Sequence, residues 1–274
     1  MGALTPREVR GYRETGYLVP GFRLGPERLE SLREALEHVV AANPGVRPER
    51  LVSVHRAGRN AEGVVGDPRF LELARDPDIL DMVSEVIGPD IILWGCQAFC
   101  KPGGDGMAVP WHQDGHYWPI RPLATCTAWV ALDDSTVENG CLRVIAGSHR
   151  EQRLLEHERD DREGLVLNRK VLDAELDEAQ AIDVELQAGQ LSLHDVYMVH
   201  GSNPNRSPKR RAGVAIRYMP ATSHFDRDLF APGDGSGYLI DFSTRPLWLL
   251  RGEDRTGRND FRIGHDREGR AEAV

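Results

Sequence analysis

The first ninety residues place apolar side chains three or four positions apart, which is the spacing of one face of a helix. This pattern predicts helices over residues 5–15, 26–41 and 71–87. Thr5 and Pro6 have the chemistry of an N-cap followed by a first helical residue. Pro77 should interrupt the third helix, and Gly88 should end it.

From residue 91 the pattern changes to short runs of strand-like length, which Gly, Pro and Asn separate. The runs are DIILWGCQAFCKPGG, TCTAWVALDD, CLRVIAGSH, AIDVEL, GQLSLHDVYMVHG and RRAGVAIRYMP. The charged stretch 150–176 suits a long excursion between two strands. Helices followed by many short strands indicate an α+β protein, mainly β, that is built on a β-sandwich or barrel.

Composition favours one domain and narrows the choice of partners. The chain has 274 residues, of which 40% are hydrophobic, and no linker-like segment divides it. We expect a single domain over residues 1–274, with a core at about 90–220 and helical support from 1–89. The net charge of −9 would repel phosphate backbones and anionic membranes, so neither nucleic acid nor a membrane is an expected partner.

Two further features predict a cytoplasmic protein. The N-terminal residues lack the apolar core of a secretory signal, and no stretch reaches the ~18 apolar residues of a membrane span. The cysteines have neither the pattern of a disulfide scaffold nor the paired spacing of a zinc site. We expect reduced, mostly buried thiols at Cys96, Cys100, Cys126 and Cys141. The oligomeric state stays open.

The segment PWHQDGHYWP, residues 110–119, concentrates side chains that can bind a metal. His112 and His116 would share one face of a helix, as in helical zinc sites, but the prolines and the glycine disfavour a helix. In an extended strand, His112 and Asp114 project to the same side instead and can hold one divalent ion. The strand interpretation is preferred, although an HxD tripeptide alone is common by chance.

A third ligand must come from elsewhere, and His200 is the best candidate. It ends the run LSLHDVYMVH and precedes the loop GSNPNRSP. His194 and Asp195 face opposite sides of a strand, so they cannot easily chelate one ion together. His149 and His157 lie in polar contexts, where solvated or capping roles are expected. Two histidines and one carboxylate form the facial triad of non-haem Fe(II) oxygenases, which leaves coordination positions open.

An arginine downstream of His200 could bind a co-substrate that carries a carboxylate. Arg211 lies eleven residues after His200, in the strand-like run RRAGVAIRY. A dicarboxylate co-substrate needs a planar, bidentate donor, which arginine supplies and lysine does not. Arg210 is the alternative, because one of two adjacent strand residues must point outward. The spacing favours Arg211.

Taken together, these residues resemble a known family. The segments WHQDGHYW, TAWVALDDSTVENGCLRVIAGSH, LSLHDVYMVHGSNPNRS and RRAGVAIRY are similar, in combination and order, to the phytanoyl-CoA dioxygenase (PhyH) family of Fe(II)/2-oxoglutarate-dependent oxygenases. The resemblance implies a double-stranded β-helix, which is a cupin-like jelly roll, with the N-terminal helices packed on one sheet. It also implies Fe(II), 2-oxoglutarate and O2, with hydroxylation of an aliphatic C–H of a small-molecule metabolite and release of succinate and CO2.

The same resemblance assigns roles to individual residues. The implied metal ligands are His112, Asp114 and His200. Arg211 and Ser202 match the residues that hold the distal carboxylate of 2-oxoglutarate. The further contacts expected with the co-substrate are Gln97, Thr127 and Trp129. Related halogenases carry a small residue in place of the carboxylate ligand, so the presence of Asp114 disfavours halogenation.

Substrate contacts are expected near the entrance of the site. His116, Tyr117 and Trp118 directly follow the HxD pair, and His55 lies in SVHRAGRN, which family geometry places near the mouth. Simple packing of the rim by Tyr117 and Trp118, and a solvated loop around His55, remain alternatives. Segments 150–176 and 221–240 are candidate lids because they are long and charged or rich in Gly and Pro.

Two other classes of function compete with the oxygenase. A jelly roll that binds a metal or a small molecule without oxygenase activity would not need Arg211 and Ser202 at their offsets from His200. A zinc hydrolase built on His112 and His116 would need the helix that the prolines disfavour.

Overall fold

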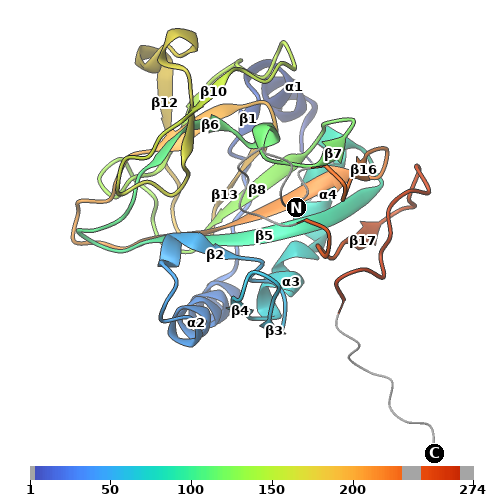
Figure 1. Ribbon diagram of the computed structural model, residues 1–274, viewed down its shortest axis with the longest axis horizontal. Coiled ribbons are helices and arrows are strands. Elements are labelled where there is room, and N and C mark those ends of the chain that lie inside the picture. The colour runs from blue at the N-terminus through green and yellow to red at the C-terminus, as the bar shows by residue number, and fades with distance from the viewer. Residues whose placement is uncertain (1–3, 230–241, 266–274) are drawn as a thin grey trace, which may run out of the picture.

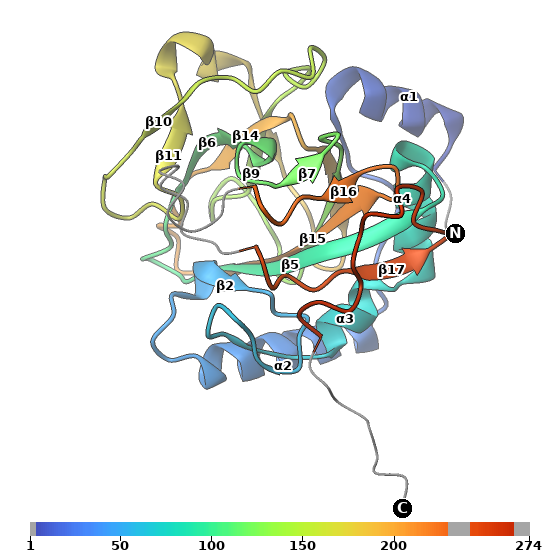
Figure 2. The same ribbon diagram turned by 45° about the vertical axis from the view of Figure 1, so that its right-hand side comes forward.

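The computed structural model describes residues 4–229 and 242–265, and two facing β-sheets form its centre (Figures 1 and 2). The seven-stranded sheet, called the large sheet below, has the order β1 (Tyr17–Leu18), β13 (Leu191–Asp195), β8 (Cys126–Ala131), β15 (Arg211–Pro220), β5 (Ile91–Lys101) and β17 (Trp248–Arg251), with β2 (Leu51–Val52) also paired to β5. The small sheet has the order β12 (Ala181–Val184), β9 (Leu142–Ile145), β14 (Val199–Ser202) and β6 (Val109–Gln113). This mainly β arrangement confirms the predicted fold class.

The predicted helices form at the expected places. They are α1 (Pro6–Thr15), α2 (Pro26–Ala42), α3 (Arg69–Ala74) and α4 (Pro77–Ile87). Thr5 and Glu8 complete a capping box at the start of α1. Pro77 separates α3 from α4, and the Asp76 side chain caps α4 by accepting hydrogen bonds from the backbone of Asp78 and Ile79.

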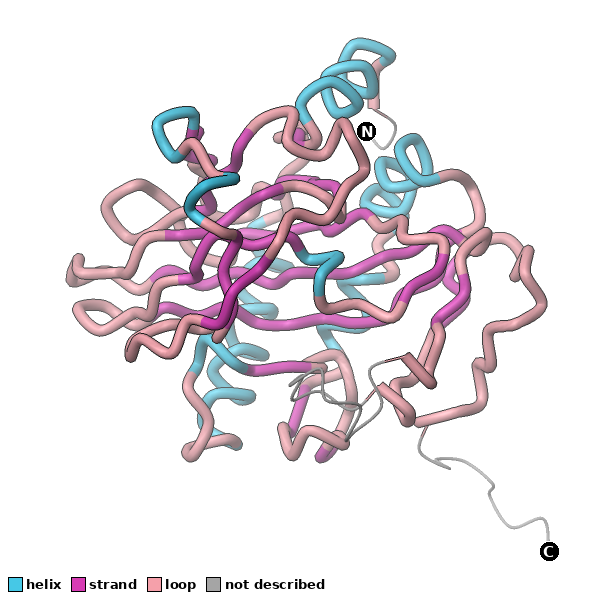
Figure 3. The backbone as a smooth tube through the Cα atoms, turned by 45° about the horizontal axis from the view of Figure 1, so that its top comes forward, coloured by secondary structure: helices cyan, strands magenta, loops and turns pink. Residues whose placement is uncertain are grey.

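The helices cover one face of the large sheet. Apolar residues of α2, such as Leu36 and Val39, join one buried cluster with Ala128, Val214 and Ile216 of the central strands. The strands lie in the middle of the molecule, and most of the helical turns lie outside them (Figure 3). The opposite face of the large sheet is therefore left to face the small sheet, and functional side chains lie there.

One predicted strand is divided in two, and this differs from the expectation. The run GQLSLHDVYMVHG contains β13, which belongs to the large sheet, and β14, which belongs to the small sheet. Asp195 fixes the crossing, because its side chain accepts a hydrogen bond from the backbone N–H of Tyr197 and its carbonyl accepts one from Met198. The two histidines of this run consequently reach the centre of the protein from opposite sheets.

The remaining elements are short. Three two-stranded pairs are β10 (His157–Arg159) with β11 (Arg169–Val171), β16 (His224–Phe225) with β7 (Ile120–Arg121), and β3 (Gly58–Arg59) with β4 (Val65–Gly66). The 3-10 helices are Pro48–Arg50, Asp114–His116, Asp173–Glu175 and Glu178–Gln180. The candidate lid 150–176 contains β10 and β11, whereas most of the other, 221–240, lies outside the described residues. Within the described ranges, the helices are too short or too polar to cross a membrane.

Candidate active site

A pocket opens between the two sheets and contains about 1060 Å³ of unfilled space, with its solvent-open mouth included. Residues of β5, β8, β13 and β15 line it from the large sheet, and residues of β6, β9 and β14 line it from the small sheet. It combines aromatic walls with a small number of charged groups, which is the usual character of a small-molecule site.

The pocket brings together His112, Asp114 and His200. Their potential ligand atoms all lie within 4.8 Å of one another, and all three residues are buried. His112 and His200 face each other across the pairing of β6 with β14, with ring centroids 4.2 Å apart. The HxD pair is not one extended strand as predicted, because β6 ends at Gln113 and Asp114 begins a 3-10 turn. The turn still brings Asp114 Oδ1 within 3.5 Å of His112 Nε2.

Hydrogen bonds prepare both imidazoles for a metal. Nδ1 of His112 lies 2.9 Å from the carbonyl of Pro110, and Nδ1 of His200 lies 2.9 Å from the carbonyl of Met198. A carbonyl can only accept, so each Nδ1 carries the proton and each Nε2 keeps its lone pair. Burial and the neighbouring His112 hold the pKa of His200 well below its usual range, which also favours the neutral ligand form. The donor set therefore fits a divalent transition metal.

Gln113 lies between the candidate ligands His112 and Asp114, and hydrogen bonds of its side chain hold this segment in position. Gln113 donates hydrogen bonds to the carbonyls of Arg153 and Tyr197 and accepts one from the backbone N–H of Leu155. These contacts tie the end of β6 to the excursion 150–176 and to the turn before β14. The side chain of Gln113 thus links the end of β6, which follows His112, to the turn that precedes β14 and His200.

Asp114 is ionised although it is buried. Burial alone would raise its pKa, but His112 and His194, with the nearby His200, hold the pKa well below its usual value. His194 Nε2 lies 3.7 Å from Asp114 Oδ2, the oxygen turned away from His112. The sequence indicated correctly that His194 and Asp195 do not chelate together, but it gave no sign that His194 contacts the carboxylate ligand from the large sheet.

Arg211 lies in the pocket at the start of β15. Its guanidinium carbon is 5.2 Å from the centroid of the Trp129 ring, and its Nε has no hydrogen-bond partner among the described residues. Gly213 makes this arrangement possible, because a Cβ there would lie 2.2 Å from the Trp129 ring. Burial lowers the pKa of Arg211 to about 10, so it is still charged at neutral pH. Thr127, which shares the pocket-facing side of β8 with Trp129, also has a buried hydroxyl without a partner in the described chain.

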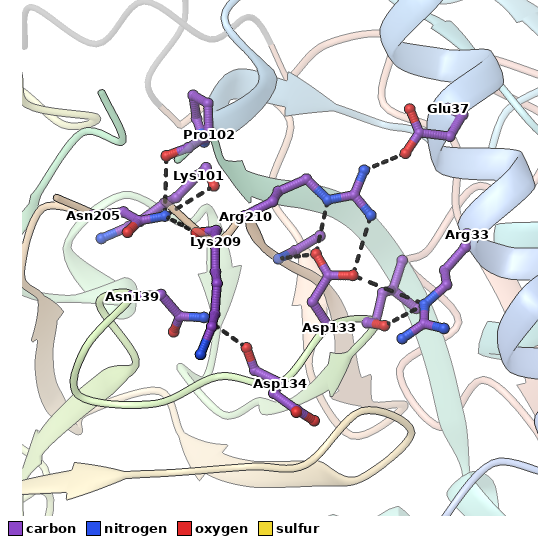
Figure 4. Close-up of polar contacts among 12 residues, drawn as sticks. Arg33, Glu37, Lys101, Pro102, Asp133, Asp134, Asn139, Asn205, Lys209 and Arg210 are labelled. Carbon is purple, nitrogen blue, oxygen red and sulfur yellow. Dashed lines mark hydrogen bonds and ion pairs between the residues drawn. The ribbon is translucent and has the colours of Figure 1, made fainter. Parts of the chain in front are cut away.

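Arg210 points to the other side of the sheet. It forms ion pairs with Asp133 and with Glu37 of α2, as Figure 4 shows. These ion pairs turn the guanidinium of Arg210 toward the helices, while Arg211 faces the pocket. The geometry thus distinguishes two neighbours that the sequence could only rank.

Lys101 is a buried residue that the sequence analysis missed. Its Nζ donates hydrogen bonds to the Ser202 hydroxyl, at 2.7 Å, and to the carbonyl of Asn203. Burial and the nearby Arg211 lower its pKa to about 6, so it adds little positive charge at neutral pH. Lys101 therefore holds Ser202 in place beside Arg211.

The residues predicted at the entrance separate into two groups. Tyr117 and Trp118 line the pocket. His116 is not one of its lining residues and instead stacks on His157, with ring centroids 3.9 Å apart. His157 was expected to be solvated, and this stacking places it beside the segment that carries the metal ligands. His55 is fully buried against Trp248, with centroids 4.6 Å apart, and is not brought to the pocket wall.

Two arginines in the pocket were not anticipated, namely Arg217 of β15 and Arg245. The signal for Arg217 was present, because it is six residues after Arg211 and so faces the same side of the strand. Arg245 lies in a segment without strand periodicity, and no pattern in the sequence indicated it.

The chain matches the family model described as Phytanoyl-CoA dioxygenase (PhyH) over residues 12–213. It belongs to the phytanoyl-CoA dioxygenase family. The peroxisomal phytanoyl-CoA dioxygenase of Homo sapiens is 30% identical over 81% of this chain and 70% of its own length. A solved non-haem monooxygenase, ThoJ in its apo form, is 26% identical, with a TM-score of 0.68 over 90% of this chain and 84% of its own.

The fold has a further solved counterpart in CytC3 with Fe(II) and alpha-ketoglutarate, at 24% identity and a TM-score of 0.64 over 94% of this chain and 92% of that one. Membership of the PhyH family makes the chain a dioxygenase that depends on Fe(II), 2-oxoglutarate and O2. The strand and 3-10 turn at residues 109–116 also remove the helix that a zinc hydrolase on His112 and His116 would need.

Proposed function

We propose that His112, Asp114 and His200 hold the catalytic Fe(II), and that the enzyme hydroxylates an aliphatic C–H of a small-molecule metabolite. The observation that carries the metal assignment is the buried convergence of one carboxylate and two imidazoles whose Nδ1 atoms are already hydrogen-bonded. Relatives named for action on phytanoyl-CoA and on ectoine support a small-molecule substrate.

We propose that the co-substrate lies between the metal ligands and Arg211. The unpaired Nε of Arg211 and the unpaired hydroxyl of Thr127 are donors that a bound carboxylate would satisfy, since a buried donor without a partner is costly. Ser202, held by Lys101, adds a hydroxyl at the same end, and the Trp129 ring supports the guanidinium. Gln97 also lines the pocket, farther from Arg211, and we propose it as a weaker contact of the co-substrate.

In this arrangement the protein binds, orients and excludes water. Fe(II) with 2-oxoglutarate and O2 supplies the oxidising power that breaks an unactivated C–H bond, with succinate and CO2 as the other products. Arg211 and Ser202 fix the distal carboxylate, which sets the distance from that end of the co-substrate to the metal ligands. Tyr117 and Trp118 line the pocket beside the ligands, where they limit the entry of water.

Two wider expectations belong to the same proposal. We propose that residues 1–274 form one domain, because residues of α1, α2, α3 and α4 share a single buried cluster with strands β5, β8, β13 and β15. A cytoplasmic location is proposed because the four cysteines are buried and free of disulfides, as expected in a reducing compartment. His55 and His116 keep their predicted substrate roles as hypotheses, although their neighbours are Trp248 and His157.

The proposal is tested by an anaerobic titration. Fe(II)-loaded protein should develop a weak visible absorption band when 2-oxoglutarate is added, and admission of O2 should release succinate. The His112→Ala variant should show neither band nor succinate, because it lacks one ligand of the triad. Retention of succinate release in that variant would overturn the metal assignment.

A further inference from the structure

The inner face of β15 carries a second arginine that the co-substrate does not use. Arg211, Gly213, Ala215 and Arg217 alternate with residues of the helix-facing cluster, so all four face the pocket. Six residues of strand separate the two arginines by about 20 Å at their Cα atoms, at roughly 3.3 Å per residue. Ser202 lies toward the Arg211 end and Trp118 toward the Arg217 end. The two guanidinium groups thus belong to different ends of the pocket-facing side of β15.

The surroundings of Arg217 hold its guanidinium in a fixed orientation. Its central carbon lies 5.1 Å from the Trp118 ring and 5.6 Å from the Trp94 ring, and the two indoles meet edge to face at 4.5 Å. One of its terminal nitrogens donates a 3.0 Å hydrogen bond to Gln97 Oε1. A strand irregularity opposite Arg217 turns Trp94 inward, and Gly95 leaves open the space that a side chain would take. Two indole rings within 6 Å of the guanidinium carbon favour a cation at this position.

The described part of the chain gives Arg217 no carboxylate that forms an ion pair with it. Within residues 4–229 and 242–265 it forms no ion pair with a carboxylate, and its buried Nε has no hydrogen-bond partner. The neighbouring Arg245 differs, because Glu62 forms an ion pair with it and the Ser53 hydroxyl accepts a hydrogen bond from it. Burial lowers the pKa of Arg217, which expresses the cost of keeping this charge in place. Such a cost is usually balanced by a partner of opposite charge.

The charges of the loaded site leave Arg217 unbalanced. The two positive charges of Fe(II) and the one of Arg211 match the carboxylate of Asp114 and the two carboxylates of 2-oxoglutarate. The negative charge of Asp114 acts on Arg217, but a bound metal would neutralise it. Trp94 adds another donor, since its buried Nε1 also lacks a partner in the described chain. Among the described residues, this end of the pocket therefore offers one positive charge and unpaired donors, and its acceptor Gln97 Oε1 carries no charge.

We propose that Arg217 binds a carboxylate of the substrate, so that the enzyme acts on small organic acids with an apolar or aromatic body. This inference rests on the proposed function, because it treats the ligand at this end as the substrate. A single unmatched positive charge fits a monoanion better than a phosphate dianion, and the planar fork of arginine fits a carboxylate. Trp94, Trp118 and Phe242 line the same end of the pocket and would contact the body of the acid.

Calorimetric titration tests this inference without turnover. Protein loaded with Mn(II) and saturated with 2-oxoglutarate, so that the Arg211 end is filled, is titrated with 3-phenylpropanoate and with straight-chain acids from butanoate to decanoate. Each acid is compared with its primary amide, which has nearly the same shape but no charge. We expect at least one acid to bind roughly 10- to 100-fold more tightly than its amide, as for a hydrogen bond to a charged group.

Variants identify the residue responsible. Arg217→Gln should abolish the preference for the acid over the amide. Arg143→Gln is the matched control, because Arg143 also lies over an indole, 5.2 Å from the Trp111 ring, but forms ion pairs with Glu178 and Asp183 outside the pocket. Should Arg217→Gln not fold, Arg217→Lys should retain the preference with about a tenfold loss, since it keeps the charge and loses the fork.

Two results would overturn the inference, namely no acid that binds better than its amide, or a preference that persists unchanged in the Arg217 variants. Failure of the proposed function would appear separately, as the absence of the visible Fe(II)/2-oxoglutarate band in the wild-type protein. The acid preference can still be read in that case, because calorimetry requires no turnover.

Discussion

The two sheets contribute different chemistry to one pocket. The small sheet and the turn after β6 supply the three residues that converge on a metal position, namely His112, Asp114 and His200. The large sheet supplies cations and aromatic walls, namely Arg211, Arg217, Trp94 and Trp129. Helices cover the outer face of the large sheet, so its strands are buried on both faces. We therefore propose that the small sheet provides the reactive centre, while the large sheet provides a rigid surface that recognises anions.

The largest effect on metal binding should come from the two histidines of the run LSLHDVYMVH, which we expect to differ when each is replaced by alanine. His200→Ala should remove a metal ligand from the small sheet and abolish both metal binding and succinate release. The His194→Ala variant should still bind the metal, but its affinity for the metal should fall by about 10- to 100-fold. The reason is that His194 contacts the carboxylate of Asp114 from the large sheet. Metal content after dialysis, measured by elemental analysis, gives both values, and equal losses in the two variants would contradict this division between the sheets.

The next effect concerns stability and the helix-covered face. Leu36→Ala should lower the free energy of unfolding by about 2–5 kcal/mol, because Leu36 is fully buried between α2 and the large sheet. Ile182→Ala on the small sheet is the control, since Ile182 is 41% exposed and should change stability by about 0.5 kcal/mol or less. Urea unfolding measures both. A similar loss in the two variants would mean that the small sheet is supported as strongly as the large one.

Recognition of the co-substrate should show a smaller but specific effect. Arg211→Gln should weaken binding of 2-oxoglutarate by about 2–4 kcal/mol, or roughly 30- to 1000-fold, since a buried charge loses its partner. Arg210→Gln should leave that affinity nearly unchanged, because Arg210 contacts Asp133 and Glu37 instead. The concentration dependence of the visible band measures the affinity. The reverse result would show that the register of β15 at the pocket is wrong by one residue.

The smallest effect should come from Ser202. Ser202→Ala should weaken the binding of 2-oxoglutarate by about 1 kcal/mol, or a few-fold, because one hydroxyl contact is lost. Lys101 would still donate a hydrogen bond to the carbonyl of Asn203, so the loop should keep its position. A loss as large as that of Arg211→Gln would indicate that Ser202, rather than the guanidinium, dominates the binding of the distal carboxylate.

Much of this architecture could be predicted from local patterns. Helical spacing located the helices that cover the large sheet, and the prolines around His112 correctly argued against a helical metal motif. Thr127 and Trp129 were predicted to contact the co-substrate, and both line the pocket. The rule that side chains alternate along a strand, applied six residues beyond Arg211, would have indicated Arg217.

Other features depended on contacts between segments far apart in the chain. The periodicity of GQLSLHDVYMVHG is compatible with one strand, and only the hydrogen bonds of Asp195 divide it between two sheets. His157 was expected to be solvated or to cap an element, but it stacks on His116 from within the excursion 150–176. Lys101 reads as a polar residue at a strand end, yet the fold buries it against Ser202.

The sequence by itself determined the kinds of side chain and their alternation along each strand, because both follow from the local geometry of the backbone. It was therefore sufficient for the helices, for the HxD pair and for the choice of arginine as an anion receptor. Tertiary structure alone decided which histidine meets Asp114 from the second sheet, which of Arg210 and Arg211 is ion-paired, and which buried cation has no carboxylate partner in the described part of the chain. These outcomes depend on what packs opposite a residue, and no local pattern in the chain records that neighbour.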